Sequence, residues 1–214
     1  MSPLEAAFAN PDPSLRLNAV LRAGMTPSLL DLEILLRQCA VEPDFQVREM
    51  LTWALIRLPA NRVVPRVIEE LARPESKARC QALHTLSKFK DPMAWPSVAG
   101  RLDDEDQDVV RTAWYAAVAL VPENKRDWLA RKLAASLGHG DAERQLSLSR
   151  ALIGLGRDVI DPVLAVAAER GNATVRQHIE TTERLLQNPA SGFATSLKRA
   201  RREVALGRTR STKG

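Results

Sequence analysis

The side chains best able to do chemistry in this sequence are its acidic run, its histidines and its cysteines. The densest carboxylate group is Asp103-Asp104-Glu105-Asp106, with Asp108 close behind. Such a run could bind a cation or a basic partner. It also stands immediately before a helical segment, where negative charge stabilises the helix N-terminus. We predict capping and solvation as its main role, with cation or partner binding as the alternative.

The histidines and cysteines are scattered along the chain. His84, His139 and His178 are not predicted to form a metal site. Cys39 and Cys80 lack the spacing of a disulfide framework or a zinc site and are predicted to be reduced thiols. The sequence contains no nucleophile elbow, phosphate-binding loop or zinc-protease motif. It therefore predicts no catalytic residue, no metal and no cofactor.

Positive charge is concentrated at the C-terminal end. The chain holds 31 Lys/Arg and 26 Asp/Glu, and the last 18 residues hold seven of the basic and one of the acidic residues. Their net charge is +6, whereas residues 1–196, with 24 basic and 25 acidic residues, are close to neutral. The basic tail could contact nucleic acid or an acidic protein, or it could be a solvated end. Its predicted contact residues are Lys198, Arg199, Arg201, Arg202, Arg208 and Arg210.

An arginine recurs at nearly constant intervals along the chain. Its spacing indicates the helices that carry the acidic, histidine and cysteine side chains. The recurring residues are Arg16, Arg48, Arg79, Arg111 and Arg176. The first four are separated by 32, 31 and 32 residues, and the fifth follows 65 residues later. That last interval has room for one further copy, in which Arg144 or Gln145 takes the arginine's place, and the common ending favours Gln145. Apolar or small residues follow three, six, seven and ten places later, which predicts a helix with one buried face.

A second apolar segment lies between successive copies, so the unit is a helix–turn–helix of about 32 residues. Asp12, Asp44 and Asn172 stand four residues before the arginine and are predicted N-caps. Prolines are expected near the starts of the first helices, at Pro27, Pro65, Pro96 and Pro162. Six units are predicted, counting the N-terminal LEAAFA as a short first helix, and no strands. Stacking would cover apolar faces that one unit cannot cover alone.

The pattern D/N-P-D-x-x-V-R-x-x-A-x-x-A-L-x-x-L resembles the short HEAT-like repeats of the phycobilisome-lyase (PBS lyase) type. The resemblance covers nearly the whole chain. It implies an all-α fold, an α-solenoid (superhelix) of about six HEAT-like two-helix repeats over residues 1–190. It also implies that the recurring arginines are structural, each pairing with an acidic residue of a neighbouring repeat to form a ladder.

The end of the chain departs from the repeat. Phe193, Leu197, Ala200 and Val204 fall on one helical stripe, and Gly207 suits a helix stop. A solenoid needs a cap with a polar outer face. We therefore predict a C-terminal capping helix at residues 191–206 and a disordered basic tail at residues 207–214.

The resemblance also implies that the arginine-bearing helices line a concave face, with residues one, two and five places after the arginine pointing into the groove. The predicted partner-binding residues are Phe45, Glu49, Met50, Trp53, Gln81, His84, Thr112 and Arg150. Aromatic and methionine side chains on such a face would suit a protein or peptide. Burial between helices is the alternative for Trp53, and Trp95, Trp114 and Trp128 are predicted to be packing residues.

The leading hypothesis is a non-enzymatic HEAT-repeat scaffold or adaptor that binds a protein or peptide partner through this concave face. One alternative is a HEAT-like DNA-binding protein or alkylpurine DNA glycosylase, against which the near-neutral body argues. Another is a bilin lyase-type chaperone, suggested by the family resemblance alone. The sequence shows neither a signal peptide nor a membrane span, which predicts a cytoplasmic protein without a membrane partner. Its Ala- and Arg-rich composition suggests a bacterial source, and its oligomeric state is left open.

Overall fold

The computed structural model describes residues 2–188, and these residues form helices and connecting loops with no strand among them. They belong to two compact units, residues 1–125 and residues 126–214. The predicted capping helix (191–206), the disordered tail (207–214) and the basic residues from Lys198 to Arg210 lie outside the described residues.

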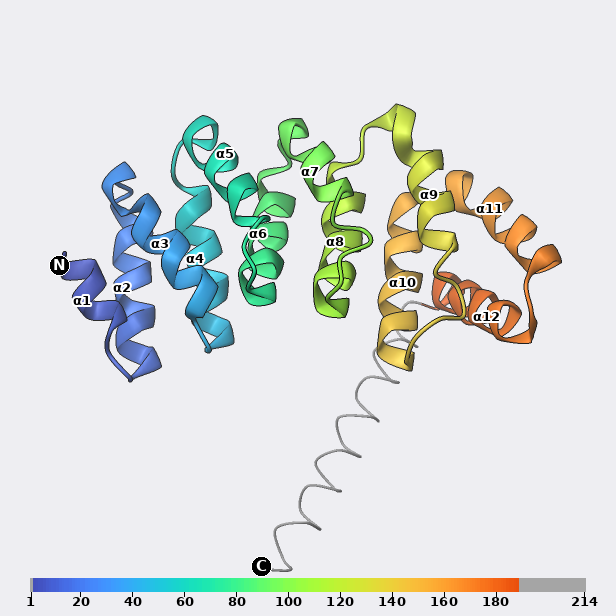
Figure 1. The fold of residues 1–214 in the computed structure, drawn as a ribbon, viewed down its shortest axis with the longest axis horizontal. Helices are drawn as coiled ribbons and strands as arrows, with labels where there is room; N and C mark the ends of the chain where they lie inside the picture. Colours follow the sequence, from blue (N-terminus) through green and yellow to red (C-terminus); the bar gives the residue numbers. More distant parts are fainter. Residues whose placement is uncertain (1, 189–214) are drawn as a thin grey trace, which may run out of the picture. The chain divides into compact units, whose positions relative to one another are not determined.

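The first unit consists of four consecutive helix pairs (Figure 1). Its α-helices are α1 (Pro3–Phe8), α2 (Pro13–Met25), α3 (Leu32–Val41), α4 (Phe45–Ile56), α5 (Ala60–Glu70), α6 (Ser76–Phe89), α7 (Trp95–Ala99) and α8 (Gln107–Leu120). Short 3₁₀ turns lie at η1 (Leu29–Asp31), η2 (Pro92–Ala94) and η3 (Glu123–Lys125). The second helices α2, α4, α6 and α8 pack side by side in one row, and α3 and α5 pack across them.

The second unit contributes two further pairs. Its helices are α9 (Arg126–Ala134), α10 (Ala142–Leu155), α11 (Arg157–Arg170) and α12 (Ala173–Gln187). The second helices α10 and α12 pack against each other, as do the first helices α9 and α11. Six two-helix repeats within residues 2–188 confirm the predicted all-α repeat fold.

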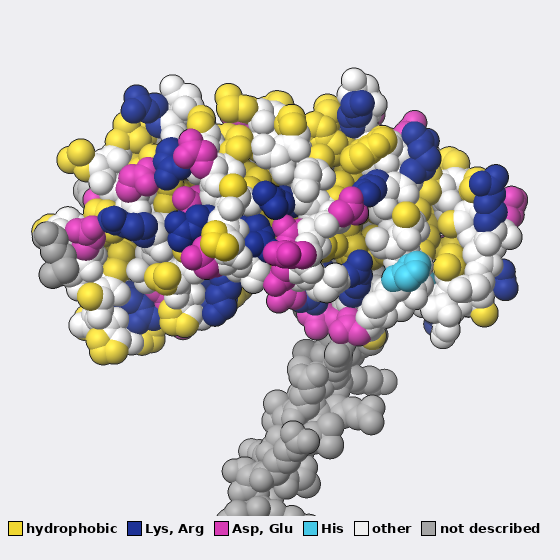
Figure 2. Space-filling model, viewed as in Figure 1, with side chains coloured by type: hydrophobic (Ala, Val, Ile, Leu, Met, Phe, Trp, Pro, Cys, Tyr) yellow, Lys and Arg dark blue, Asp and Glu magenta, His cyan; other side chains and the backbone are white. Residues whose placement is uncertain are grey.

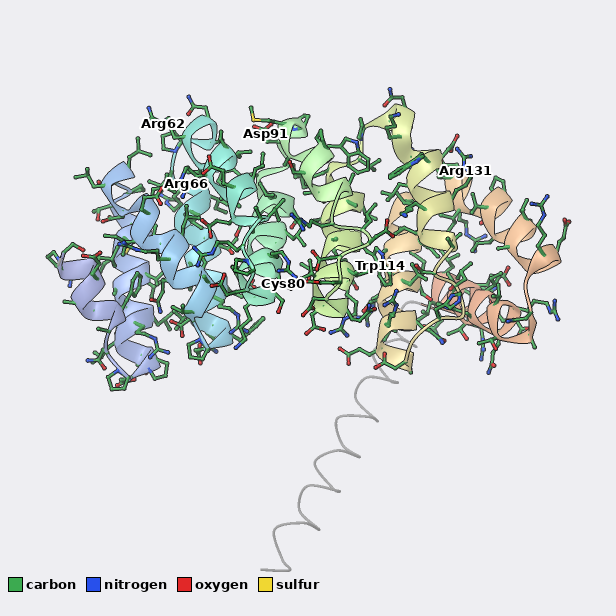
Figure 3. All side chains as sticks on the ribbon, in the orientation of Figure 1. Arg62, Arg66, Cys80, Asp91, Trp114 and Arg131 are labelled. Carbon is green, nitrogen blue, oxygen red and sulfur yellow. The ribbon has the colours of Figure 1, made fainter. Side chains whose placement is uncertain are left out.

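The predicted apolar columns form the core. The residues three, six, seven and ten places after Arg48 are Leu51, Ala54 and Leu55 of α4 and Leu58 just beyond its end, and each is buried. In α8 the indole of Trp114 (labelled in Figure 3) is enclosed, as predicted. Burial of such side chains contributes about 1.5–3 kcal/mol each before the entropy of ordering is subtracted.

Trp128 corrects the prediction that it packs, because it is 42% exposed on α9. The buried side of α9 is formed by Leu129, Ala130 and Leu133. Trp128 precedes this stripe by one residue and is therefore turned away from it by about 100°. Trp95, at the start of α7, is half-buried.

The predicted N-caps are confirmed. Asp12, Asp44 and Asn172 accept hydrogen bonds from backbone N–H groups of α2, α4 and α12. Within the acidic run, Asp106 caps α8 by accepting from the N–H groups of Asp108 and Val109. The run thus does act as a cap, which accounts for the acid immediately before the helix.

Two of the four prolines lie deeper in their helices than predicted. Helix α5 begins at Ala60 and helix α11 at Arg157, so Pro65 and Pro162 fall inside them. A proline leaves the carbonyl four residues earlier without its helical donor. Those carbonyls belong to Asn61 and Asp158, both exposed, so water can replace the missing N–H.

The recurring arginines hold the loop that precedes their own helix. The Nη1 groups of Arg16, Arg48 and Arg79 each donate to the carbonyl oxygens six and five residues earlier, at 2.7–3.0 Å. Arg176 donates to the carbonyl five residues earlier, and Gln145 does the same to Gly140. Gln145 therefore occupies the arginine's position in the fifth repeat, as its register predicts.

Two of these arginines also reach a carboxylate of the next repeat. Arg16 makes a two-point contact with Glu42, with Nε–Oε2 and Nη2–Oε1 distances of 2.9 and 2.7 Å. Arg79 Nη2 lies 2.8 Å from Asp104 Oδ1, and both pairs are buried. Burial would raise the pKa of Glu42, but hydrogen bonds from Arg16, the Asp44 N–H and Gln38 outweigh it, so the pKa is lowered. Glu42 is consequently ionised in the folded protein.

The implied ladder is interrupted at Arg48, which has no carboxylate partner among residues 2–188. Residues 25 and 26 places after Arg48 are Arg73 and Pro74, where Glu42 and Asp104 stand for the other two arginines. Arg48 instead lies over the Phe45 ring, 5.9 Å from its centroid. The other two members of the predicted ladder have different contacts: Arg111 binds Asp108 three residues before it, and Arg176 is exposed.

Candidate partner-binding face

Helix α4 and its C-cap residue Arg57 present a stripe of four side chains spaced four residues apart. We call Phe45, Glu49, Trp53 and Arg57 the α4 stripe. Phe45 and Arg57 are exposed, whereas Glu49 and Trp53 are half-buried. Spacing by four keeps the side chains on one side of the helix over three turns. The stripe therefore offers two aromatic rings and two opposite charges on one surface of the row of second helices.

Trp53 is held by two neighbours. Its ring lies against Gly24 of α2, where a Cβ atom would come within 2.0 Å of Trp53 Cζ3. The Arg57 guanidinium also lies over the ring, 5.5 Å from its centroid. The glycine removes the steric obstacle and the guanidinium is attracted to the ring face. The indole is thus fixed in place while part of it still faces solvent.

Glu49 and His84 lie across the gap between α4 and α6. His84 Nε2 is 3.2 Å from Glu49 Oε1, though out of hydrogen-bonding alignment. Burial is the main reason that the pKa of His84 is lowered; Lys88 adds to this, and Glu49 opposes it. The pair is therefore a neutral imidazole beside a partly exposed carboxylate near neutral pH.

Gln81 corrects the prediction that it lines the groove, because it is only 7% exposed. Its Nε2 donates to Thr52 Oγ1 at 2.7 Å and to the Arg48 carbonyl at 3.2 Å. The Thr52 hydroxyl lies 3.2 Å from that of Thr85. Gln81 thus belongs to a polar layer that joins α4 to α6, where a buried amide must be hydrogen-bonded.

The remaining predicted residues are dispersed. Met50 is half-buried on α4. Thr112 is half-buried on α8 and donates to the Asp108 carbonyl at 2.8 Å. Arg150 is exposed on α10 and belongs to the second unit. The structure therefore brings together Phe45, Glu49, Trp53 and His84 of the predicted set.

Sequence reasoning missed one member of the α4 stripe, Arg57, and two exposed side chains near it, Met25 and Lys88. Met25, at the end of α2 next to Gly24, is 72% exposed. Arg57 and Lys88 follow Trp53 and His84 by four residues and are exposed. The spacing rule for helices could have found the two basic residues. Met25 could have been found because it stands 32 residues before Arg57, at the equivalent position of the preceding repeat.

The second unit repeats the polar layer with different residues. His178, two places after Arg176, is 2% exposed. Its Nδ1 accepts from the Gly138 N–H at 3.0 Å, and its Nε2 lies 2.9 Å from the Gln145 carbonyl and 3.1 Å from Ser149 Oγ. A carbonyl can only accept, so Nε2 carries the proton. The imidazole therefore cannot accept a proton from Ser149 through Nε2, and this Ser–His contact is structural.

Charge on the first unit is mixed rather than of one sign. Basic and acidic side chains are interspersed over α3 and α5 on the side seen in Figure 2. Arg66 (labelled in Figure 3) contacts Glu33 of α3, and Arg37 contacts Glu5 of α1. Within residues 2–188 no three His, Cys, Asp or Glu side chains are grouped closely enough to hold a metal ion. In that part of the chain no helix is both long and apolar enough to cross a membrane.

Comparison with known proteins bears on the fold. The family model of HEAT repeats matches residues 32–119, which span α3 to α8. Over this segment the chain is similar to HEAT repeats. The match supports the HEAT-repeat family, while the PBS lyase type remains an expectation from the sequence. No curated protein matches the chain.

Two crystal structures, each described as an engineered protein of the Northeast Structural Genomics Consortium, are also similar. One is 18% identical with a TM-score of 0.45, covering 89% of this chain and 100% of its own. The other is 17% identical with a TM-score of 0.46, covering 90% of this chain and 98% of its own.

Proposed function

We propose that this protein is a non-enzymatic repeat scaffold that binds a protein or peptide partner through the row of second helices in its first unit. The anchor of that site is the α4 stripe with Met25 beside it. The supporting observation is Trp53, which is immobilised by Gly24 and Arg57 yet keeps part of its ring exposed. A preordered aromatic side chain loses little entropy on binding, which is why such residues dominate interfaces.

The surroundings of Trp53 favour a partner with both apolar and charged groups. Met25 and Phe45 are 72% and 65% exposed, a large share for apolar side chains. Glu49 and Arg57 stand between and beyond the two rings and could pair with charges on the partner. An amphipathic segment with one apolar side chain seated against Trp53 would satisfy both features.

The test is affinity capture from the native cell with three variants and the wild type. Met25→Ser removes an exposed methionine beside Trp53, and Trp53→Ala removes the anchor. Met93→Ser is the matched control, because Met93 is 59% exposed on η2, outside the α4 stripe. We expect one co-purifying protein to be lost with the first two variants and kept with the third.

A direct measurement then follows with the captured protein. Removing an anchor residue typically costs 2 kcal/mol or more, which is a loss of about 30-fold in affinity. Equal affinity of Met25→Ser, Trp53→Ala and wild type, with each variant folded by circular dichroism, would contradict the proposal.

A further inference from the structure

An open groove lies between the last two helices of the second unit. It is lined by apolar and charged side chains of α11 and α12, and its volume is about 230 Å³. The apolar lining comprises Leu164, Ala165, Ala168, Ile179 and Leu186. Together with Asp161 on α11 and Glu183 on α12, these residues recur every three or four positions on each helix, so they form two facing stripes.

In the first unit, the positions equivalent to this groove are covered by the next helix pair. Counting from Arg48 and Arg176, Leu36 and Ala40 of α3 correspond to Leu164 and Ala168 of α11, 128 residues later. In the first unit these positions are buried, because the helices of the next pair, α5 and α6, pack on them. The groove on α11 and α12 is therefore the face that a following repeat covers.

The charges of the groove have a counterpart as well. Asp161 of the groove corresponds to Glu33 of α3 in the same register. Glu33 binds Arg66 of the next repeat through both carboxylate oxygens, at 2.7 and 2.9 Å. Glu183 adds a second carboxylate to the groove lining, which also holds one basic side chain, Arg157, so the acidic groups outnumber the basic one. The covering segment should consequently be apolar on one side and basic beside it.

We infer that residues 191–206 of this chain fold back as a helix and occupy the groove between α11 and α12. The segment begins three residues after Asn188, and Leu186 and Gln187, at the end of α12, line the groove. Its sequence offers one apolar stripe, Phe193, Leu197, Ala200 and Val204. Sixteen helical residues would extend about 24 Å, more than the roughly 11 Å between Asp161 and Ala168 along α11.

Charge favours this occupant of the groove. The segment carries Lys198, Arg199, Arg201 and Arg202 against a single acid, Glu203, which suits Asp161 and Glu183. A segment with one apolar stripe flanked by basic side chains therefore matches the lining of the groove.

Hydrogen–deuterium exchange on the full-length chain tests the assignment. Ala165→Arg fills the groove from an exposed position, and Leu197→Asp places a charge in the apolar stripe of the segment. The matched controls are Val166→Arg, at the next and 48% exposed residue of α11, and Thr195→Asp, on the opposite side of the segment's helix. We expect amides of residues 191–206 to exchange at least tenfold faster in both groove variants, and at the wild-type rate in both controls.

Three outcomes would overturn the inference. One is equal exchange of residues 191–206 in all five proteins. Another is loss of protection with Val166→Arg as readily as with Ala165→Arg. The third is protection of the groove that disappears on dilution together with a shift from dimer to monomer in sedimentation velocity, which would assign the groove to a second copy of the chain.

Discussion

At the scale of single residues, the position of Trp53 depends on a residue without a side chain. Gly24 lies inside α2, where glycine costs about 1 kcal/mol relative to alanine. The cost is offset because Trp53 occupies the space where a Cβ would stand. The exposed aromatic of the proposed site therefore depends on a neighbour in the preceding repeat.

Gly24→Ala is predicted to destabilise the protein although it improves helix propensity. The added methyl would overlap the indole, and overpacking of this kind costs about 1–3 kcal/mol. The measurement is the urea midpoint of unfolding. Gly100→Ala is the control, because a Cβ there meets only backbone oxygen at an ordinary 3.5 Å. A midpoint for Gly24→Ala at or above wild type would show that Trp53 moves away without cost.

Glu42→Gln is predicted to cost about 3 kcal/mol of unfolding free energy. The amide would leave the Arg16 guanidinium buried without its counter-charge, which is more costly than the intact pair is favourable. The matched control is Glu33→Gln, whose pair with Arg66 is largely exposed, so its loss should cost less than about 1 kcal/mol. Urea unfolding of both variants at neutral pH measures the difference, and similar losses would contradict the argument.

At the scale of helices, neighbouring second helices are joined by matched positions. Gln81 bonds Thr52 and the Arg48 carbonyl, and His178 lies beside Ser149 and the Gln145 carbonyl in the same register. The α2–α4 contact has Val20, Met50 and Ala54 at these positions. The α4–α6 and α10–α12 contacts are therefore polar at these positions, whereas the α2–α4 contact is apolar.

This layer explains a failure of sequence reasoning. Helical spacing and the arginine register predicted the helices, their caps and the buried columns, because each depends on local sequence. Gln81 was assigned to the groove because it stands two places after Arg79, a position that the family resemblance places on the concave face. Its burial depends on Thr52, 29 residues earlier, so only a comparison of polar positions between repeats could have found it.

Acidification is predicted to destabilise the contact between α10 and α12. Burial lowers the pKa of His178 below its ordinary 6.5, with the Gln145 hydrogen bond opposing the shift. The unfolded chain then binds the proton more readily, so stability is full above about pH 6.5 and falls as pH drops toward the folded-state pKa. Carboxylates such as Glu42 have lowered pKa values and lose stability only below about pH 4.5, outside this window.

His178→Gln should reduce this pH dependence, because Gln81 fills the equivalent position in α6 and makes the same carbonyl contact. The measurement is the midpoint of thermal unfolding at about pH 7.5 and about pH 5.5. His139→Gln is the control, since His139 is exposed, and it should behave as wild type. His84, whose pKa is also lowered by burial, leaves a residual dependence in both. An unchanged pH response in His178→Gln would exclude this imidazole as the cause.

At the scale of the whole molecule, residues far apart in the sequence occupy equivalent positions in successive repeats. The number of repeats follows from the arginine intervals, and the structure of residues 2–188 agrees with it. The interruption of the arginine ladder at Arg48 could also be predicted from the sequence, because Arg73 and Pro74 stand where an acidic residue is needed. The contacts of Trp53 could not be predicted from the sequence, because they depend on how closely α2 approaches α4.

Each compact unit has its own enclosed leucines, Leu83 on α6 in the first and Leu152 on α10 in the second. In a repeat protein each helix pair contacts only its neighbours, so a cavity weakens mainly the adjacent repeats. Truncating a buried leucine to alanine costs about 2–5 kcal/mol. Leu83→Ala should therefore speed amide exchange in α4, α6 and α8, while α11 and α12 keep their wild-type rates. Leu152→Ala should speed amide exchange in α9, α11 and α12, while α2 and α4 keep their wild-type rates. Faster exchange throughout the described helices in either variant would mean that the two units unfold as one cooperative body, because a loss confined to neighbours requires that the units open separately.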